Sequence, residues 1–480
     1  MEKKIINGTK WSVIGEFSGK IITPIINMVL ARLLIPSEFG VVINITIITS
    51  FADILTDGGF QKYIIQREFL SNKDKEQVIN VAFWTNFLLS IFVYTLIFLF
   101  RSPLAQMLGN ERLASIIPIA SIQVILTSFT SIQIGILRRD FKFKSLFINR
   151  IITTAIPLFI TIPLALLNFS YWSIIIGNIF SLVISSIILF IQSNWRPKIY
   201  YSIRQLKEMF GFSSWTQLES LFIWLTQWSD SFFVGKFMNS YFLGIYKTSM
   251  STVSSILQLI SSSTVPAMFS GLARVQNDEP KFNNIYYSTQ KFSSLFLIPL
   301  GIGMYSYSDF LVKILLGNQW KGAGFVVANW AITSCLMVIF NTYSMEVYRA
   351  IGKPQISMLT QIINFIILVF TIFLFSSAGF EKLVIARSWS RLILIFVHSY
   401  FLYKIRKINV LQTFKNIYMY IFSSSIIILI SYLQKRYSET FLFNFVGIIF
   451  CIIGYFTLLL LFKSERKLLF LLIKKRRIQS

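Results

Sequence analysis

Apolar segments of about 20 residues recur along almost the whole chain, and this repetition constrains the fold more than any other feature. A helix needs roughly that length to cross a ~30 Å hydrocarbon core. Lipid offers the backbone no hydrogen bonds, so each segment must be helical. The predicted spans cover residues 11–33, 39–55, 78–100, 114–137, 146–166, 171–191, 212–235, 243–265, 287–311, 324–343, 358–375, 383–403, 417–433 and 441–462. The sequence therefore predicts an all-α polytopic membrane protein with about fourteen transmembrane helices.

The basic residues follow these spans with a strong bias. The 480-residue chain is 55% hydrophobic and carries a formal charge of +25. If the N-terminus is cytoplasmic, about two thirds of the 45 Lys and Arg residues fall in cytoplasmic segments. The bias predicts an even number of spans with both termini in the cytoplasm. Anionic lipid headgroups account for the charge, so it indicates no nucleic-acid partner.

Motifs for soluble catalysis are missing from the sequence. We find no P-loop, no HExxH, no paired CxxC and no GxSxG, so nothing predicts a cofactor, a metal site or a catalytic residue. The two cysteines, Cys335 and Cys451, lie inside apolar runs and predict no disulfide. The loops are short, and segments 61–76 and 192–211 are amphipathic. These features weigh against a membrane enzyme with an external catalytic domain.

Three short echoes indicate an internal repeat with a period of about 200 residues. ARLLIPSEFGVV resembles GKFMNSYFLGIY, which pairs Arg32 with Lys236 and Gly40 with Gly244. SPLAQMLGN resembles FLVKILLGN, and ILRRDFKFKSL resembles VYRAIGKPQIS, in the same order. Two related lobes are typical of transporters with a site between the halves. We expect an N-lobe of six helices over 1–191, an amphipathic cytoplasmic linker over 192–211, a C-lobe of six helices over 212–405, and a final helix pair with a basic cytoplasmic tail over 406–480.

Polar residues inside the spans fall on single helical faces. In the first span they recur at i, i+4, i+7 and i+11, a spacing that places them on one stripe. Similar stripes occur in the spans over 212–235, 243–265 and 383–403. The first two stripes contain Glu16, Lys20, Thr23 and Asn27, then Thr216, Glu219, Ser220, Gln227 and Asp230. The other two contain Lys247, Ser251, Ser254 and Gln258, then Arg387, Arg391 and His398.

A charge within the bilayer costs ~2.5 to 3.5 kcal/mol, so these residues should face a partner or a wet cavity. A cationic lumen is suited to phosphate groups, for which Arg offers forked donors. Two simpler readings stay open. Glu16 and Lys20 can form a pair that neutralises itself, and His398 can be a packed, hydrogen-bonded histidine.

Seven segments together resemble the polysaccharide-transporter flippases, which move lipid-linked oligosaccharides within the multidrug, oligosaccharidyl-lipid and polysaccharide flippase superfamily. The likeness covers most of the chain. The segments are ARLLIPSEFGVV, FADILTDGGFQKYIIQRE, LRRDFKFK, WSDSFFVGKFMNSYFLGIYKTS, VPAMFSGLARVQND, LLGNQW and YRAIGKP. The nearest subgroup handles lipopolysaccharide O-antigen or exopolysaccharide units.

The resemblance implies two lobes around a central cavity, alternating access, and transfer of an undecaprenyl-diphosphate-linked glycan from the cytoplasmic to the outer leaflet of a bacterial cytoplasmic membrane. As partners it implies a lipid-linked anionic oligosaccharide and membrane lipids, and it leaves open a proton or sodium ion and a polysaccharide polymerase or export machinery. The predicted substrate-binding residues, by placement, are Lys20, Arg150, Lys247, Arg387 and Arg391, with Arg32 and Lys236 at the outer rim. The predicted ion-coupling residues are Glu16, Glu219 and Asp230.

Two other functions compete with this interpretation. A drug or cation antiporter of related architecture would prefer an acidic, aromatic cavity. A membrane-embedded glycan polymerase or ligase would need larger outside loops than this sequence offers.

Overall fold

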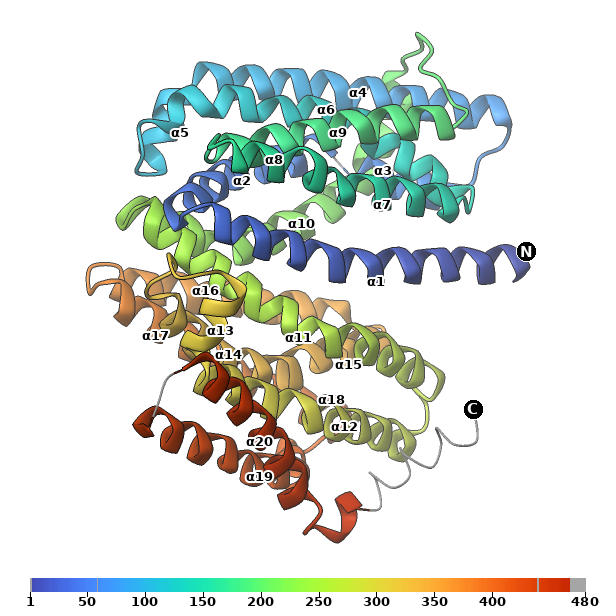
Figure 1. The fold of residues 1–480 in the computed structure, drawn as a ribbon. Helices are drawn as coiled ribbons and strands as arrows, with labels where there is room; N and C mark the ends of the chain where they lie inside the picture. Colours follow the sequence, from blue (N-terminus) through green and yellow to red (C-terminus); the bar gives the residue numbers. More distant parts are fainter. Residues whose placement is uncertain (1, 58, 438–439, 467–480) are drawn as a thin grey trace. The chain divides into compact units, whose positions relative to one another are not determined.

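The computed structural model describes residues 2–57, 59–437 and 440–466; the side chains of residues 2–10, 12–13, 16–17, 211–216 and 218–219 lie outside the description. Helices dominate these residues, and no strand occurs among them (Figure 1). The first ten helices are α1 Glu2–Leu33, α2 Pro36–Asp57, α3 Phe60–Gln66, α4 Asn72–Leu99, α5 Arg101–Met107, α6 Leu113–Arg139, α7 Phe143–Phe159, α8 Thr161–Leu166, α9 Trp172–Gln192 and α10 Ile203–Phe237. The remaining elements are α11 Ser240–Arg274, α12 Glu279–Ser306, α13 Ser308–Leu315, α14 Ala323–Met337, the π-helix η1 Val338–Thr342, α15 Tyr343–Ala350, α16 Pro354–Phe375, α17 Phe380–Ser390, α18 Ile393–Arg406, α19 Val410–Tyr437 and α20 Phe441–Leu459.

Local sequence sets several helix boundaries. The Ser71 hydroxyl accepts from the amide of Asp74 at 3.1 Å and caps the start of α4. Asp278 caps α12 in the same way, and its carboxylate also lies 2.8 Å from the ammonium of Lys281. The hydrogen bonds from Lys281 lower the pKa of Asp278. Short polar residues thus start helices at the ends of the apolar segments.

The chain forms two compact units, Met1–Lys247 and Thr248–Ser480. In the first unit α4 packs on α6 and α6 packs on α9, and these helices run side by side in Figure 1. The lobes that the sequence predicts over 1–191 and 212–405 stay predictions, because the division into units is one of packing and not of membrane spans.

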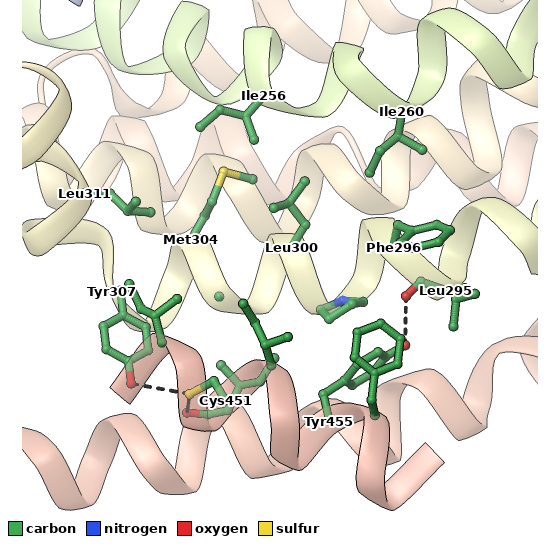
Figure 2. A pocket seen from close by; sticks show the side chains of 16 residues that line it. Ile256, Ile260, Leu295, Phe296, Leu300, Met304, Tyr307, Leu311, Cys451 and Tyr455 are labelled. Carbon is green, nitrogen blue, oxygen red and sulfur yellow. Dashed lines mark hydrogen bonds between the residues drawn. The ribbon is translucent and has the colours of Figure 1, made fainter. Parts of the chain in front are cut away.

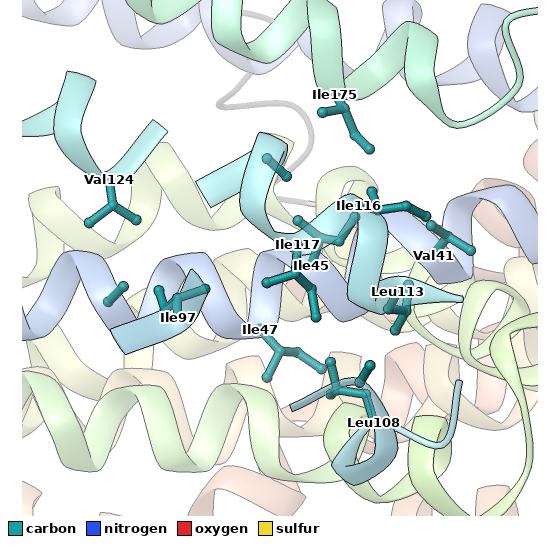
Figure 3. Packing of buried hydrophobic residues seen from close by; sticks show 13 residues of the cluster. Val41, Ile45, Ile47, Ile97, Leu108, Leu113, Ile116, Ile117, Val124 and Ile175 are labelled. Carbon is teal, nitrogen blue, oxygen red and sulfur yellow. The ribbon is translucent and has the colours of Figure 1, made fainter. Parts of the chain in front are cut away.

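Branched aliphatic side chains fill a core in the first unit. Figure 3 shows Ile45 of α2 and Ile117 of α6 pointing toward one another, and both are buried. The cluster extends to Ile97 at the end of α4 and to Ile175 of α9. Burying each such side chain contributes about 1.5–3 kcal/mol. This core fixes the ends of α2 and α6 relative to each other.

Gly40 of α2 and Gly244 of α11, which the predicted repeat pairs, each lie against the backbone of the other helix. A Cβ added to Gly40 would lie 1.7 Å from the carbonyl oxygen of Ser240, and one added to Gly244 would lie 1.8 Å from that of Pro36. Ser240 and Pro36 are the first residues of α11 and α2, so the contact is reciprocal. Only glycine permits this approach of two helix backbones.

Three breaks interrupt the helices of the second unit. α12 and α13 meet at 86° around Tyr307. η1 inserts a π-helical turn between α14 and α15, and α17 ends at Ser390, with Arg391 as its C-cap residue just before α18. π-helical turns within α-helices occur often at functional sites.

The prediction of an all-α polytopic protein is confirmed, whereas the number fourteen is not. Among the described residues, ten helices are long and apolar enough to cross a membrane, or eleven if the bent α12–α13 pair forms one span. α1, α10 and the pair α17–α18 are not among them. All three segments carry a polar stripe, which lowers their mean hydropathy, and α17–α18 is also broken; α11 carries such a stripe too but still includes a sufficiently apolar window.

Candidate functional site

Arg391 is the best-supported cation among the predicted binding residues. Its guanidinium lies 3.5 Å from the ring centre of Trp330 on α14 and donates to the hydroxyls of Thr333 at 2.8 Å and Ser334 at 2.9 Å. A ring face and two hydroxyls restrict a side chain that otherwise has many rotamers. The result is a positioned, half-buried guanidinium, the group that best matches phosphate oxygens.

Arg387 lies in the same cluster, as its spacing from Arg391 predicts. It is buried, and its guanidinium carbon is 5.9 Å from the centre of the Trp330 ring. The Trp389 indole donates to the Asn329 side chain at 3.3 Å, which ties α17 to α14 beside the two arginines. We call Trp330, Thr333, Ser334, Arg387 and Arg391 the arginine cluster.

His398 follows Arg391 by seven residues and faces η1 and α15, which continue α14. Its Nε2 lies 2.6 Å from Oδ1 of Asn341 in η1, and its Nδ1 lies 3.1 Å from the hydroxyl of Tyr348. Since Asn341 Oδ1 can only accept, Nε2 carries the proton and Nδ1 accepts from Tyr348. The histidine is buried and fully bonded, which agrees with the simpler reading of a packed residue.

The predicted cations of the first unit do not gather at one point. Arg150 of α7 lies against α1, because a Cβ on Gly19 would meet its guanidinium at 3.0 Å. Lys20 follows Gly19 on α1 and is partly exposed. Lys247 donates to the carbonyl of Gln227 at 2.9 Å and lies 4.3 Å from the Trp228 ring centre. Arg150 and Lys20 therefore share one region, whereas Lys247 belongs with α10.

Arg32 and Lys236 are exposed residues at the ends of α1 and α10. Lys236 lies over the ring of Phe237, with 5.6 Å between its ammonium and the ring centre. These positions are compatible with the predicted rim, which stays a prediction.

Of the three predicted coupling residues, Asp230 has a described side chain, while the side chains of Glu16 and Glu219 lie outside the described residues. Asp230 is buried, and its carboxylate accepts from the amide of Ser231 at 2.7 Å and the hydroxyl of Tyr246 at 3.3 Å. The bond from Tyr246 links α10 to the start of α11.

Sequence reasoning missed two partly buried carboxylates on α2. Asp53 accepts from the Thr127 hydroxyl at 2.8 Å, and Asp57 accepts from the Ser131 hydroxyl at 2.6 Å. Both pairs are spaced by four residues, so one face of α2 meets one face of α6. Two carboxylates four residues apart, within and directly after a predicted span, are a sequence signal of charged groups held in the membrane region.

An apolar cavity of about 410 Å³ lies among α11, α12 and α20 of the second unit (Figure 2). Ile256, Leu300 and Met304 point into it. The polar atoms at its wall are already bonded: Tyr307 donates to Gln434 at 2.5 Å, and Tyr455 donates to the carbonyl of Leu295 at 2.8 Å. The cavity therefore presents hydrocarbon and suits a hydrocarbon ligand.

Residues 29–324, more than half of the chain, match the family model described as polysaccharide biosynthesis protein. The chain belongs to this family. It is 21% identical to the succinoglycan biosynthesis transport protein ExoT of Rhizobium meliloti (strain 1021), over 71% of this chain and 68% of that protein. It is 22% identical to the lipopolysaccharide biosynthesis protein WzxC of Escherichia coli (strain K12), over 67% of this chain and 65% of that protein.

Solved structures agree on the fold. The inward closed conformation of the lipid II flippase MurJ matches with a TM-score of 0.76 and 16% identity, covering 96% of this chain and 100% of that one. An inward-facing multidrug resistance transporter of the MATE family matches with a TM-score of 0.61 and 12% identity, covering 79% and 92%. The predicted resemblance is thus confirmed: the chain is a multi-span membrane protein of a polysaccharide biosynthesis family, its relatives are named as transport and biosynthesis proteins, and its fold is shared with MurJ and MATE transporters.

Proposed function

We propose that the protein is a flippase that moves a polyprenyl-diphosphate-linked oligosaccharide from the cytoplasmic to the outer leaflet of a bacterial cytoplasmic membrane by alternating access. The arginine cluster carries this proposal. A ring face and two hydroxyls hold this guanidinium in one place among apolar helices, and a positioned guanidinium matches the oxygens of a phosphate group. A diphosphate is the anion that such a lipid-linked glycan supplies.

The apolar cavity supports the lipid part of this substrate. Its wall is hydrocarbon, and it lies in the same unit as the arginine cluster. In this proposal the cavity takes part of the polyprenyl chain, the arginines take the diphosphate, and the hydrophilic sugars cross without contacting lipid. A polysaccharide polymerase or export machinery would receive the product on the far side.

The proposal includes a topology of fourteen spans with both termini in the cytoplasm. The eleven apolar spans, counting α12–α13 as one, leave α1, α10 and α17–α18 as three further crossings. These polar helices hold Lys20, Asp230 and Arg391. Charged faces on three crossings are compatible with a wet interior. The six-helix lobes predicted from the sequence need all three.

We propose that transport is coupled to a proton or sodium ion through carboxylates, with Asp53 and Asp57 added to Glu16, Glu219 and Asp230. A carboxylate held at low dielectric can couple its ionisation to conformation. Asp53→Asn and Asp57→Asn keep the hydroxyl contacts but remove the charge. Each should make export insensitive to an imposed pH or sodium gradient in inverted vesicles; a full gradient response in both variants contradicts this assignment.

Deletion of the gene tests the main proposal. Lipid-linked oligosaccharide should accumulate on the cytoplasmic leaflet, and surface polysaccharide should disappear. The wild-type gene should restore both, whereas Arg391→Ala should restore neither although the protein inserts normally. Lys382→Ala, which removes an exposed charge from the same helix α17, is the matched control and should restore both.

Three results would overturn the proposal. The first is unchanged leaflet distribution of the lipid-linked glycan after deletion. The second is altered drug susceptibility with intact surface polysaccharide, which indicates a drug antiporter. The third is glycan elongation or transfer by the purified protein, which indicates a polymerase or ligase.

A further inference from the structure

A second apolar groove, of about 690 Å³, lies between α18 and the start of α19 in the second unit. One face of α18 forms a wall, because its lining residues recur at i, i+4, i+8 and i+11. Leu336 of α14 also lines it. This wall consists of Leu392, the N-cap residue of α18, and of Ile395, Phe396, Ser399, Tyr400 and Tyr403, and the α19 side contributes Ile408, Asn409, Val410, Leu411 and Phe414.

The groove opens outward. Phe396, Tyr400 and Tyr403 are 76%, 60% and 57% exposed, and Leu411 on the opposite wall is 68% exposed. In a chain that spans a membrane, such exposed apolar side chains are covered by lipid. The groove differs from the cavity of Figure 2, with which it shares no lining residue.

Two cations lie at one end of this groove. The ammonium of Lys404 is 5.6 Å from the ring centre of Tyr400, and that of Lys407 is 5.1 Å from the ring centre of Tyr403. Both lysines are exposed, and neither forms an ion pair with any residue that the structure describes. Tyrosine and lysine together at a helix end are typical of headgroup depth.

The turn that carries these lysines is held firmly. Arg406 donates to the carbonyl of Gln276 at 2.7 Å, and the Asn409 amide donates to the Tyr287 hydroxyl at 2.8 Å. These bonds fix the turn between α18 and α19 against the turn between α11 and α12 and against α12 itself. The two ammonium groups therefore stand beside the groove without a rearrangement of the backbone.

We propose that the groove binds one anionic phospholipid from the leaflet that meets the turn between α18 and α19. The phosphate lies between Lys404 and Lys407, and one acyl chain follows Tyr403, Tyr400 and Phe396 toward Leu392. Charge complementarity selects an anionic headgroup. Leu392 follows Arg391 in the chain, so the end of the acyl chain lies next to the arginine cluster. This site is separate from the proposed transport substrate.

Native mass spectrometry of the purified full chain tests the proposal. The protein is mixed with equal amounts of phosphatidylglycerol and phosphatidylcholine that have identical acyl chains. Wild type should retain phosphatidylglycerol preferentially, and Lys404→Gln with Lys407→Gln should reduce this retention about tenfold. Lys313→Gln with Lys435→Gln, which removes two exposed lysines elsewhere in the same unit, should retain the wild-type preference.

A second variant tests the acyl chain. Ser399→Phe fills the groove while both lysines stay, and it should lower phosphatidylglycerol retention by a similar factor; unchanged retention overturns the groove as the chain site. Equal loss in the Lys313 and Lys435 control indicates unspecific charge attraction and overturns the site. Displacement by a short polyprenyl diphosphate, at concentrations where inorganic phosphate has no effect, assigns the groove to the transport substrate and overturns the proposal.

Discussion

At the scale of single residues, the position of Arg391 depends on side chains of another helix. Trp330 supplies a flat face, and Thr333 and Ser334 supply two acceptors on the next turn of α14. The ring face matches the planar guanidinium and a flexible ammonium only poorly, and the two hydroxyls both accept from its Nη2. The cluster is therefore built for arginine and not merely for positive charge.

Arg391→Lys tests this directly. The charge remains, but the stacking on Trp330 is lost and the shorter side chain cannot place a nitrogen where Nη2 of Arg391 donates to both hydroxyls, so export in the deletion strain should fall about tenfold. The measurement is the rate at which surface polysaccharide appears after induced expression. Lys382→Arg, the reverse exchange on the same helix, should leave the rate unchanged. A wild-type rate for Arg391→Lys would show that charge alone is sufficient.

At the scale of elements, two contacts between helices depend on the identity of single residues. The crossing of α2 and α11 needs glycine at 40 and 244, since an added Cβ meets a backbone carbonyl. The segment after α20 is held by Glu465, which is fully buried and accepts from Lys291 and Tyr420, each at 2.6 Å. One contact depends on the absence of a side chain and the other on a buried charge.

Gly40→Ala should lower the free energy of unfolding by about 1–3 kcal/mol, because the helices must separate to admit the methyl group. Gly244→Ala should have a similar effect, since the contact is reciprocal. Thermal unfolding in detergent measures both. Gly303→Ala is the control: no atom lies within 4 Å of the added Cβ, so stability should not fall. Equal melting temperatures for all three variants would contradict the close crossing.

Glu465→Ala should destabilise the second unit by about 3–5 kcal/mol, because it leaves the ammonium of Lys291 without its carboxylate in a largely buried place. The double variant Lys291→Met with Glu465→Gln should recover most of this loss, since it removes both charges and keeps an acceptor for the Tyr420 hydroxyl. Unfolding in denaturant provides the measurement. A double variant as unstable as Glu465→Ala would show that the stability comes from packing around Glu465 instead of from the ion pair.

The elements also show what sequence can predict. Each predicted span corresponds to a helix or a bent pair, because apolar length alone decides where a helix can cross lipid. Arg387 and Arg391 were found by their spacing on one helix. Trp330, Thr333 and Ser334 were not, because they precede the arginines by more than fifty residues and only packing of α14 on α17 brings them together. The turn η1 likewise depends on tertiary contacts.

At the scale of the whole molecule, the number of crossings decides where the ends of the chain lie. Eleven apolar spans place the termini on opposite sides of the membrane, whereas fourteen place them on the same side. The distribution of Lys and Arg favours the even number, because each missed crossing would invert the side of every later loop. All three disputed segments carry polar stripes, so the number of crossings also decides how many charged helix faces lie within the membrane.

Labelling of single cysteines introduced into a Cys335→Ala, Cys451→Ala background decides whether α17–α18 crosses the membrane. Lys353→Cys lies before α16, Ala378→Cys lies between α16 and α17, and Lys407→Cys lies between α18 and α19. If α17–α18 crosses the membrane, a membrane-impermeant maleimide added to intact cells should label position 378 and leave 353 and 407 unlabelled until the cells are opened. Labelling of 378 and 407 from the same side would show that α17–α18 turns back, which would remove one crossing and place the arginine cluster in a re-entrant hairpin.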